Sequence, residues 1–367
     1  MPLLLAIILI IIAFYVMTKI IDEHFIKSLD NISEWLKLPE SVSGATLLAF
    51  GTSAPEISTA LFALFLTSAS PAIGVGAIVG SAIFQILVVI GFAAVVKTAY
   101  LNWQPVVRDS AVYAAAIILL VLFIRDGVFT TIEGAILVAS YGGYLVLLYL
   151  WARYLEPPSE PDPLELVEKE TLKKHRPGQP HGLRQLSAFV RVPVDRILSL
   201  IPDAQKYPKW TVPVFVLSLL IIAGASYLMV ISATSLATTL GVPAAIIGLT
   251  ILAGGTSIAE LVSSAIVSRQ GRGDMAIANA IGSNTFDILI SLGLPVLIYT
   301  LIHGPVTDFG GANITSSLLL LFFTLLAVLL LLASQKFKIT RKMGWVLIGI
   351  YIVYVIAAYS GWLGNGG

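Results

Sequence analysis

The chain is organised around the stretch Gly44-Ala-Thr-Leu-Leu-Ala-Phe-Gly-Thr-Ser-Ala-Pro-Glu56, which puts a carboxylate inside an apolar run of membrane-spanning length. An ionised group at that depth costs roughly 2.5–3.5 kcal/mol on insertion scales, so an intramembrane acid indicates a functional site. The motif returns 204 residues later as Gly248-Leu-Thr-Ile-Leu-Ala-Gly-Gly-Thr-Ser-Ile-Ala-Glu260, identical at eight of thirteen positions. A duplicated acidic motif in membrane-length segments predicts a transporter built from two inverted repeats, with its ion site at the interface between them.

The composition excludes an ordinary soluble domain. Of 367 residues, 57% are hydrophobic and only 12% are charged, whereas about a quarter of the residues in soluble domains are charged. The net charge of +1 gives no sign of a nucleic-acid partner. The absence of cysteine excludes disulfides and Cys-based metal sites. Four histidines fall outside the apolar runs, which disfavours a His-based transition-metal site: His24, His175, His181 and His303.

Ten apolar runs are long enough to span a bilayer, since about 20 apolar residues cross its hydrocarbon core. Their expected bounds are 3–21, 41–66, 71–96, 108–124, 131–152, 212–230, 242–267, 274–301, 313–333 and 342–360. The first run lacks a basic n-region and a clear cleavage site, so we expect a retained span and not a signal peptide. The sequence therefore predicts an all-α membrane protein with ten transmembrane helices.

A polar stretch divides the ten spans into two sets of five. Residues 153–210 hold nine of the eighteen prolines, and a stretch of this length and composition is too small to bury a core. We therefore expect a first repeat at 1–152, a cytoplasmic loop at 153–210 and a second repeat at 211–367. Within the loop, Leu183–Ile201 alternates apolar residues with arginines, which is typical of a helix on the membrane surface or of a solvated linker.

The distribution of Lys and Arg predicts the orientation in the membrane. With the N-terminus outside, 21 of the 22 basic residues fall on the cytoplasmic side, and without the long loop the ratio is still 11 to 1. Both termini are therefore expected outside, in a cell (plasma or inner) membrane. Because five spans per half is an odd number, the halves enter the membrane in opposite directions, and the two glutamates approach its midplane from opposite sides.

Each half continues with a second motif on the following span. Gly80-Ser-Ala-Ile-Phe-Gln-Ile-Leu87 aligns with Gly282-Ser-Asn-Thr-Phe-Asp-Ile-Leu289 at an offset of 202. Three acids thus lie well inside the predicted spans, namely Glu56, Glu260 and Asp287, and no basic residue in a span interior is available to pair with them. Unpaired buried carboxylates either take up a proton or hold a cation.

Oxygen donors surround these acids in the sequence. The hydroxyl residues of the two motifs are Thr52, Ser53, Ser81, Thr256, Ser257 and Ser283. Oxygen ligands without thiolate or imidazole suit hard ions such as Ca²⁺, Mg²⁺ or Na⁺. Glycines and a proline weaken the helix at the same points, which is expected to free backbone carbonyls for an ion: Gly51, Gly255 and Pro55 act on Thr52, Thr256, Ala49 and Ala253. Neither a cofactor nor an enzymatic reaction is expected, and the partners are inorganic cations and the lipid bilayer, with no obligate protein partner evident.

The paired motifs resemble the alpha-repeats of the cation/calcium exchanger superfamily, the sodium/calcium exchangers and their relatives. The second motif, which ends in Gly-Ser-Asn-Thr-Phe-Asp287, is most similar to the potassium-dependent branch. The resemblance implies Ca²⁺ ligation by Glu56, Glu260 and the carbonyls of Thr52 and Thr256. It implies Na⁺ ligation by Ser53, Ser81, Ser257, Ser283 and the carbonyls of Ala49 and Ala253. It places Asp287 at the position associated with potassium dependence, and so implies Ca²⁺/Na⁺ antiport with K⁺ as a further candidate ion.

Two residues depart from the family pattern. Gln85 stands where the family usually has Asn, so a longer amide sits among the sodium ligands. Ala259 replaces the Pro that usually precedes the acid, so a milder kink is expected in the second copy.

Four other interpretations of these residues are open. A Ca²⁺/H⁺ exchanger is the nearest, because buried carboxylates can take up protons. A channel is disfavoured, since many cation filters are rings of equivalent groups. Gly271-Arg-Gly-Asp274 fits an intramembrane aspartyl protease pattern, but its Tyr-Asp partner motif is absent from the chain. Gly/Ser/Thr-rich motifs also serve as packing surfaces between membrane helices, although that does not explain a duplicated carboxylate.

Overall fold

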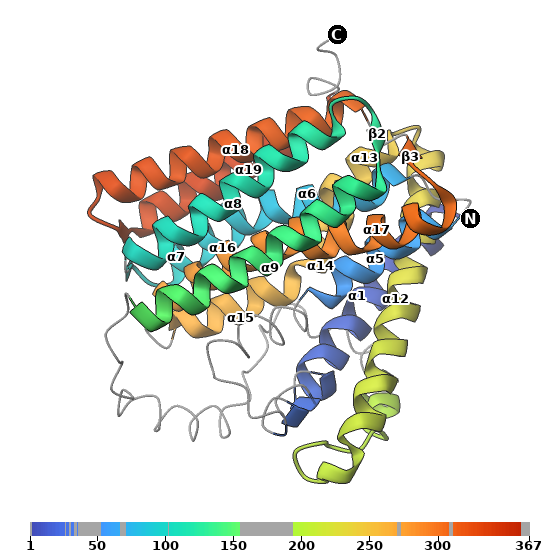
Figure 1. The fold of residues 1–367 in the computed structure, drawn as a ribbon. Coiled ribbons are helices and arrows are strands. Elements are labelled where there is room, and N and C mark those ends of the chain that lie inside the picture. The colour runs from blue at the N-terminus through green and yellow to red at the C-terminus, as the bar shows by residue number, and fades with distance from the viewer. Residues whose placement is uncertain are drawn as a thin grey trace.

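The computed structural model describes residues 2–25, 53–66, 71–101, 103–154, 194–269, 273–307 and 311–360, with Lys27, Ser28, Asn31, Ile32 and Trp35. Within these residues the chain forms a helical bundle with two very short antiparallel sheets (Figure 1). Residues 44–52 lie outside the described part, and with them Ala49 and Thr52.

The first half contains five helical segments that are described in full or in part. Their bounds are α1 (Leu3–Ile20) with the π-helical η1 (Ile21–Phe25), α5 (Ala54–Phe65), α6 (Pro71–Phe84) with η3 (Gln85–Val89) and α7 (Ile90–Val96), α8 (Trp103–Ile124) and α9 (Thr131–Tyr154). Two strands lie between them, β1 (Ala99–Tyr100) and β2 (Val128–Phe129).

The second half repeats this order. It runs from η5 (Pro208–Trp210) and α12 (Thr211–Leu240) to α13 (Ala244–Ile247), η6 (Gly248–Leu252), α14 (Ala253–Thr256) and α15 (Ile258–Arg269), then to α16 (Gly273–Phe286), η7 (Asp287–Leu292), α17 (Gly293–His303), α18 (Gly311–Ser334) and α19 (Arg341–Tyr359). Its strands are β3 (Val306–Thr307) and β4 (Lys338–Ile339).

The helix lengths are those of an integral, multi-pass membrane protein. Among the described residues, eight helices are long and apolar enough to cross a bilayer, and two further apolar helices are shorter, Ala54–Phe65 and Ala244–Thr256. These two shorter helices belong to the spans that carry the duplicated glutamate motif. Leu122, Leu330 and Val353 on the outer helices are more than half exposed, as side chains that face lipid should be.

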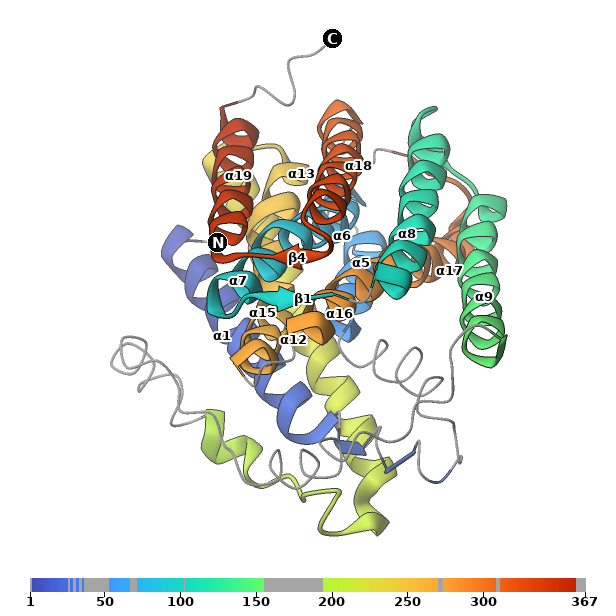
Figure 2. The same cartoon turned by 90° about the vertical axis from the view of Figure 1, so that its left-hand side faces the viewer.

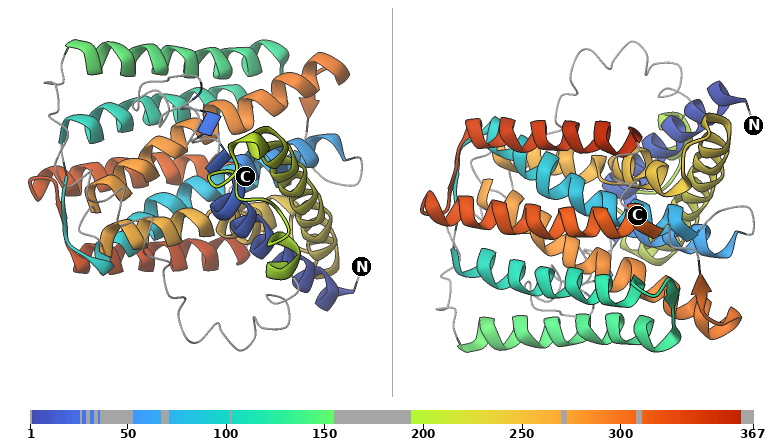
Figure 3. Two further views of the ribbon diagram at one scale, coloured as in Figure 1. Left: turned by 90° about the horizontal axis from the view of Figure 1, so that it is seen from below. Right: turned by 90° about the horizontal axis from the view of Figure 1, so that it is seen from above.

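Two spans form the centre of the bundle. In Pro71–Val96 and Ala280–His303, 83% and 61% of the most apolar stretch is buried inside the protein, against 39% or less in the other six long spans. α8, α9, α18 and α19 lie around these spans (Figures 2 and 3). The central spans are those that carry the second motif of each half, so the candidate ligands converge on the core.

Several helix ends differ from the expected bounds, among them the start of α8 at Trp103 where 108 was expected. The span expected at 212–230 continues to Leu240, and threonines in its last turns donate their hydroxyls to carbonyls of the same helix: Thr234 Oγ1 to Val230 O (2.8 Å) and Thr239 Oγ1 to Ser235 O (2.7 Å). The first span continues through η1, so His24 lies in its last turn and is buried instead of falling outside it.

The two sheets join the halves at opposite ends of the bundle. β1 of the first half pairs with β4 of the second, and β2 of the first half pairs with β3 of the second. Both pairs are antiparallel and two residues long, with Ala99 opposite Ile339 and Phe129 opposite Val306. Each sheet therefore ties a connection of one half to a connection of the other.

Glycines allow α6 of the first half and η6 of the second half to pack closely. A Cβ at Gly80 of α6 would collide with the backbone of Leu249 in η6, and a Cβ at Gly248 would collide with the backbone of Ile73. Close backbone approach of this kind is a known use of glycine. α6 of the first half thus packs directly on the segment that leads into Thr256 and Ser257.

The end of the central loop docks on α1. Leu198 is 4% exposed and packs in a cluster with Ile21 and Phe25. Asp195 accepts a hydrogen bond from Tyr15 Oη (2.6 Å), and Lys27 Nζ lies 3.1 Å from Asp203 Oδ2. The sequence predicts either a helix on the membrane surface or a solvated linker for Leu183–Ile201. Residues 183–193 lie outside the described part, and 194–201 are held against the helices.

Candidate ion-binding site

A helix begins directly after the serine that lies three residues before each glutamate. Ser53 has φ −94° and ψ 10° at the start of α5, and Ser257 has φ −90° and ψ 8° between α14 and α15. The two serines therefore have nearly the same backbone conformation, although Pro55 follows the first and Ala259 the second. The milder kink expected in the second copy stays a prediction, because the residues before Ser53 lie outside the described part of the chain.

Each glutamate lies in the first turn of the helix that follows its serine. Glu56 is 1% exposed in α5 and Glu260 is 2% exposed in α15. Backbone N–H groups at a helix N-terminus favour a negative charge there. The Glu56 carboxylate is near enough to those of Glu260 and Asp287 to interact electrostatically with both, and the Thr256 side chain lies beside it. Three acids from both halves thus share one buried region.

Hydroxyl and amide groups link the halves beside these acids. Ser81 Oγ of α6 lies 2.7 Å from Ser257 Oγ, within hydrogen-bond distance. Gln85 Nε2 donates to Ser81 Oγ (3.4 Å), and Ser283 Oγ of α16 donates to Gln85 Oε1 (2.7 Å). The chain Ser257–Ser81–Gln85–Ser283 therefore crosses between the halves twice, and its four members were all expected from the sequence.

Asp287 is held by a different set of contacts. Its Oδ2 accepts from Gln85 Nε2 (3.4 Å) and its Oδ1 from Ser291 Oγ (3.1 Å), and Ser53 lies beside it. Ser291 was missed by the sequence reasoning, which stopped at the motif boundary. The signal was its position four residues after Asp287 on the same helix, where side chains meet.

π-helical turns begin at the two polar residues of the second motifs. η3 starts at Gln85 and η7 at Asp287, residues that are 202 positions apart. A third π-helical segment, η6, leads from Gly248 to Leu252, just before Ala253. π-turns inside α-helices occur frequently at functional sites, because they release backbone groups from the regular pattern. Their matched positions therefore mark the same region as the side chains do.

Not every predicted ligand is equally available. Ala49 and Thr52 lie outside the described residues. Ala253 O already accepts hydrogen bonds from Ser257 N (3.2 Å) and Thr256 Oγ1 (3.3 Å). An ion at this carbonyl would have to replace one of those donors, since a carbonyl oxygen has two lone pairs.

The site offers oxygen ligands and little positive charge. Within the described ranges, the ion pairs Lys19–Glu23, Lys19–Asp195, Lys27–Asp203 and Arg108–Asp109 do not involve Glu56 or Asp287. No group of three His, Cys, Asp or Glu side chains in the described part of the chain is placed to hold a metal ion. A cation at this site would therefore be held by at most two carboxylates, with neutral hydroxyl, amide and carbonyl oxygens completing its shell.

α1 covers the second glutamate motif from outside the central helices. The ring of Phe14 fills the space that a Cβ of Gly255 would occupy. A side chain at 255 would therefore displace α1, which explains a glycine next to Thr256.

Known proteins share this sequence pattern and this fold. Residues 6–150 and 210–360 match the profile of the family described as sodium/calcium exchanger protein. Sodium/potassium/calcium exchanger 5 of Homo sapiens is 30% identical, covering 84% of this chain and 74% of its own. Sodium/potassium/calcium exchanger 4 of Mus musculus is 26% identical, covering 93% of this chain and 79% of its own. The solved structure of the sodium-calcium exchanger NCX_Mj soaked with Na⁺ and Sr²⁺ has a TM-score of 0.58 at 22% identity, covering 97% of this chain and 99% of that chain.

Proposed function

Because the chain belongs to the sodium/calcium exchanger protein family, we propose that it is a secondary antiporter that exchanges Ca²⁺ for Na⁺ across a membrane by alternating access. The observation that carries the proposal is that Glu56 of the first half and Glu260 of the second are both almost fully buried and lie close enough for their charges to interact. The relatives named above are sodium/potassium/calcium exchangers, so K⁺ is a candidate third ion.

We assign the ligands as follows. Ca²⁺ takes the carboxylates of Glu56 and Glu260, which balance its charge, and the carbonyls of Thr52 and Thr256. Na⁺ takes the oxygens of Ser53, Ser81, Ser257, Ser283 and Gln85, with the carbonyls of Ala49 and Ala253. Because Ser81 and Ser257 contact each other beside the glutamates, the two ions compete for one region. Exchange requires such competition, since a ligand shifts a protein between states only through its differential affinity for them.

We further propose that the chain has ten spans, arranged as two inverted five-helix repeats at 1–152 and 211–367, with 153–210 as the connecting loop. The strand pairs support this, because a two-fold axis that exchanges β1 with β3 and β4 with β2 converts one sheet into the other. Helix contacts agree: Gly91 of α7 lies against Gly344 of α19, and Gly293 of α17 lies against Leu137 of α9. Gly91 and Gly293 are 202 residues apart, the offset of the second motifs.

The proposed orientation has both termini outside and the central loop in the cytoplasm of a cell membrane. Since the chain has no cysteine, single introduced cysteines report accessibility without background. Asp126→Cys, next to β2, should react with an impermeant maleimide from the outside of intact cells. Gln335→Cys, next to β4, should react only after permeabilisation. The reverse pattern would invert the proposed topology. Labelling of both cysteines from one side would contradict the placement of β2 and β4 at opposite ends of the bundle.

The transport proposal is tested in vesicles that contain the purified protein. Ca²⁺ uptake should follow an outward Na⁺ gradient, and Glu56→Gln should reduce it more than about 100-fold, because a buried cation loses a charged ligand. Glu133→Gln is the matched control: Glu133 caps α9 at Thr130, away from the site, and its variant should transport normally. Normal Ca²⁺ uptake by Glu56→Gln would remove the site assignment.

A Ca²⁺/H⁺ exchanger is the alternative outcome of the same assay. It is favoured by the lack of a basic partner for Glu56 and Asp287 in the described ranges, since protons could then neutralise these acids. The assay is therefore repeated with a pH gradient and no Na⁺. Full uptake driven by the proton gradient alone would replace Na⁺ by H⁺ as the counter-ion.

A further inference from the structure

The helices α8 and α18 occupy equivalent places in the two halves. Their buried faces follow the same register at an offset of 208: Val106, Ser110, Tyr113, Ile117, Leu120 and Ile124 correspond to Ile314, Leu318, Leu321, Leu325, Val328 and Leu332. α8 packs on α16 and η7, whereas α18 packs on α6. Each therefore lines one side of a central span, and the two faces can be compared position by position.

That comparison shows two buried polar positions on α8 that are apolar on α18. Ser110 and Tyr113 of α8 correspond to Leu318 and Leu321 of α18, whereas buried Asp109 corresponds to buried Ser317. The central spans differ in the same sense. Asn284 and Thr285 of α16 correspond to Ala82 and Ile83 of α6, at the offset of 202 that also relates Asp287 to Gln85. The helix that leads to the Asp287 carboxylate therefore has polar residues at two positions where the helix that leads to the Gln85 amide has apolar ones.

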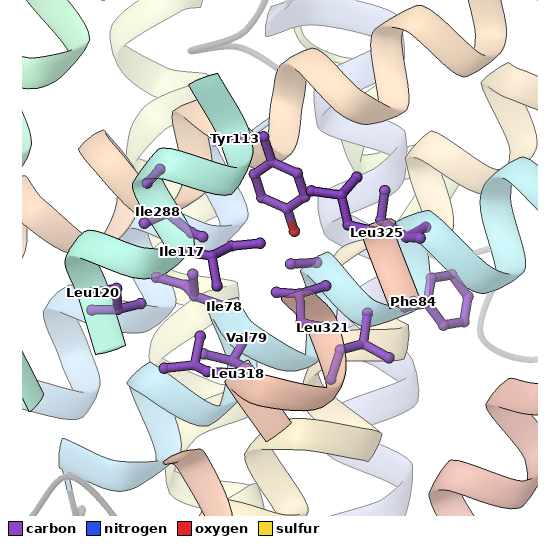
Figure 4. Packing of buried hydrophobic residues seen from close by; sticks show 14 of the residues in the cluster. Ile78, Val79, Phe84, Tyr113, Ile117, Leu120, Ile288, Leu318, Leu321 and Leu325 are labelled. Atoms are coloured by element: carbon purple, nitrogen blue, oxygen red, sulfur yellow. The ribbon is translucent and has the colours of Figure 1, made fainter. Parts of the chain in front are cut away.

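α8 packs against the helix that carries Asp287. It contacts α16 and η7, and β1, which precedes α8, also contacts α16. Ile117 and Ile288 belong to one buried cluster (Figure 4). Tyr113 and Asn284 each lie one turn before these residues on their own helices, and Ser110 lies about one further turn back on α8. The Tyr113 ring points into the core in Figure 4, and its hydroxyl interacts electrostatically with Asp287.

These polar groups are buried without hydrogen-bond partners. Ser110, Tyr113, Asn284 and Thr285 have 0% exposure, and Ser110 Oγ, Tyr113 Oη, both amide atoms of Asn284 and Thr285 Oγ1 accept or donate no hydrogen bond in the described part of the chain. Buried polar atoms are normally paired, and each exception needs an explanation. Tyr113 lies near Asp287, and the residue equivalent to Tyr113 in the other half is the apolar Leu321. An unpartnered hydroxyl near a buried carboxylate on this side alone indicates a ligand.

We propose that Ser110 and Tyr113 of α8 provide neutral oxygen ligands for a desolvated monovalent cation whose charge is balanced by Asp287, and that Tyr113 sets the selectivity of this site. A single carboxylate with hydroxyl and amide oxygens balances one positive charge, whereas a divalent ion would retain an excess charge in a buried place. The site lies on α8, outside the two duplicated motifs. The inference rests on the proposed antiport function, to which it adds the monovalent ligands.

The test measures how Na⁺-driven Ca²⁺ uptake depends on K⁺, and on Li⁺, Rb⁺ and Cs⁺ in its place, in vesicles. Tyr113→Phe removes one oxygen and keeps the ring. We expect the half-maximal K⁺ concentration to rise about tenfold, the loss expected for one contact to a charged group, and the preference among the alkali ions to flatten. Tyr354→Phe is the matched control, since Tyr354 is equally buried and bonds Ser317 away from Asp287. It should retain the wild-type K⁺ response.

The possible outcomes separate this inference from the function on which it rests. Absence of Na⁺-driven Ca²⁺ uptake by the wild-type protein would refute the antiport proposal itself. Uptake that is insensitive to every alkali ion, or an unchanged K⁺ response in Tyr113→Phe, would overturn the α8 site while leaving antiport intact. Should Tyr113→Phe fail to fold, Ser110→Ala and the K⁺-induced shift in melting temperature of the purified protein provide the same test, and an unaltered shift would again overturn it.

Discussion

The two halves of this protein have similar backbone conformations at the candidate site but contribute different numbers of carboxylates to it. Ser53 and Ser257 have nearly the same dihedral angles, and a buried glutamate follows each of them. The second motifs then diverge, because one contains the neutral Gln85 and the other Asp287. The matched residues form the shared part of the candidate site. The unmatched carboxylate makes that candidate site asymmetric in charge, and α8 has Ser110 and Tyr113 where α18 has Leu318 and Leu321.

The sharpest way to break this comparison is to move the carboxylate. Asp287→Asn should abolish or weaken the K⁺ response by at least about tenfold, because a monovalent cation loses its only charged ligand there. The double variant Gln85→Asp, Asp287→Asn places the carboxylate in the first half. It should fail to restore the response, since α18, which packs on α6 in the first half, has Leu318 and Leu321 where α8 has Ser110 and Tyr113. The measurement is Ca²⁺ uptake at varied K⁺.

Restoration of the K⁺ response by the double variant would show that the position of the carboxylate is immaterial. It would also show that α8 contributes nothing specific to the K⁺ response. Glu56→Gln, which removes a shared ligand, calibrates the assay, because it should stop Ca²⁺ transport at every K⁺ concentration.

Equivalent glycines should respond differently to the same substitution. Gly80→Ala puts a Cβ against the backbone of Leu249, whereas a Cβ at Gly282 meets nothing within 4 Å in the described structure. Gly80→Ala should destabilise the protein by about 1–3 kcal/mol, the usual cost of overpacking. Gly282→Ala should be neutral or stabilising by up to about 1 kcal/mol, since Ala favours a helix. Thermal unfolding of both purified variants checks this, and equal losses would contradict the asymmetric packing.

Ser291 supports the carboxylate of the second half only. Its hydroxyl donates to Asp287 Oδ1 over 3.1 Å, and the equivalent residue of the first half is Val89. Ser291→Ala should shift the half-maximal K⁺ concentration by roughly fivefold, about 1 kcal/mol, through loss of that hydrogen bond. Val89→Ala is the matched control and should change stability without changing the K⁺ response. An effect of equal size in both variants would mean that packing, not the hydrogen bond, is responsible.

The smallest effect is expected where the central loop meets α1. Burial raises the pKa of Asp203, but hydrogen bonds from Lys27 and from Gln205 N, together with the Lys27 charge, outweigh burial and hold the pKa below its usual value. Because this carboxyl has the lower pKa in the folded state, its stabilising effect is complete above its usual pKa of 3.8 and is lost as the pH falls further.

Asp203→Asn should therefore lower the free energy of unfolding by about 1 kcal/mol or less, as for other exposed ion pairs. The difference in melting temperature from the wild type should be constant between pH 5 and 8 and should shrink below about pH 4. A difference that grows on acidification would show that Asp203 is protonated in the folded protein at neutral pH.

Much of the site was accessible from the sequence because its residues are duplicated. The spacing of Ser81 and Gln85, and of Ser283 and Asp287, places each pair one helical turn apart. In the structure Gln85 is hydrogen-bonded to each of the other three residues. The expected pairing of Glu56 with Glu260 followed from their matched positions and from burial. By contrast, Ser291 and Tyr113 are not repeated in the other half, so comparison of the motifs could not find them.

Local helix geometry was less accessible. Nothing in the apolar pattern distinguishes the π-turns at Gln85 and Asp287 from ordinary helix, because one additional residue per turn leaves the composition unchanged. The predicted end of this span, residue 230, lies ten residues before the end of α12 at Leu240, in a stretch where Thr234 donates its hydroxyl to Val230 O of the same helix. Docking of residues 194–210 on α1 depends on contacts between segments about 180 residues apart.

The sequence by itself determined that this chain spans a membrane, that an acidic motif is present twice, and that hard cations suit its oxygen ligands. These properties follow from composition and spacing, which are local. Only the tertiary structure decided which groups meet: Ser81 with Ser257, Gln85 with Asp287, and Ser283 with Gln85. The physical reason is that each of these contacts joins helices from different halves, and their approach is set by packing at residues such as Gly80 and Gly248 instead of by any local pattern.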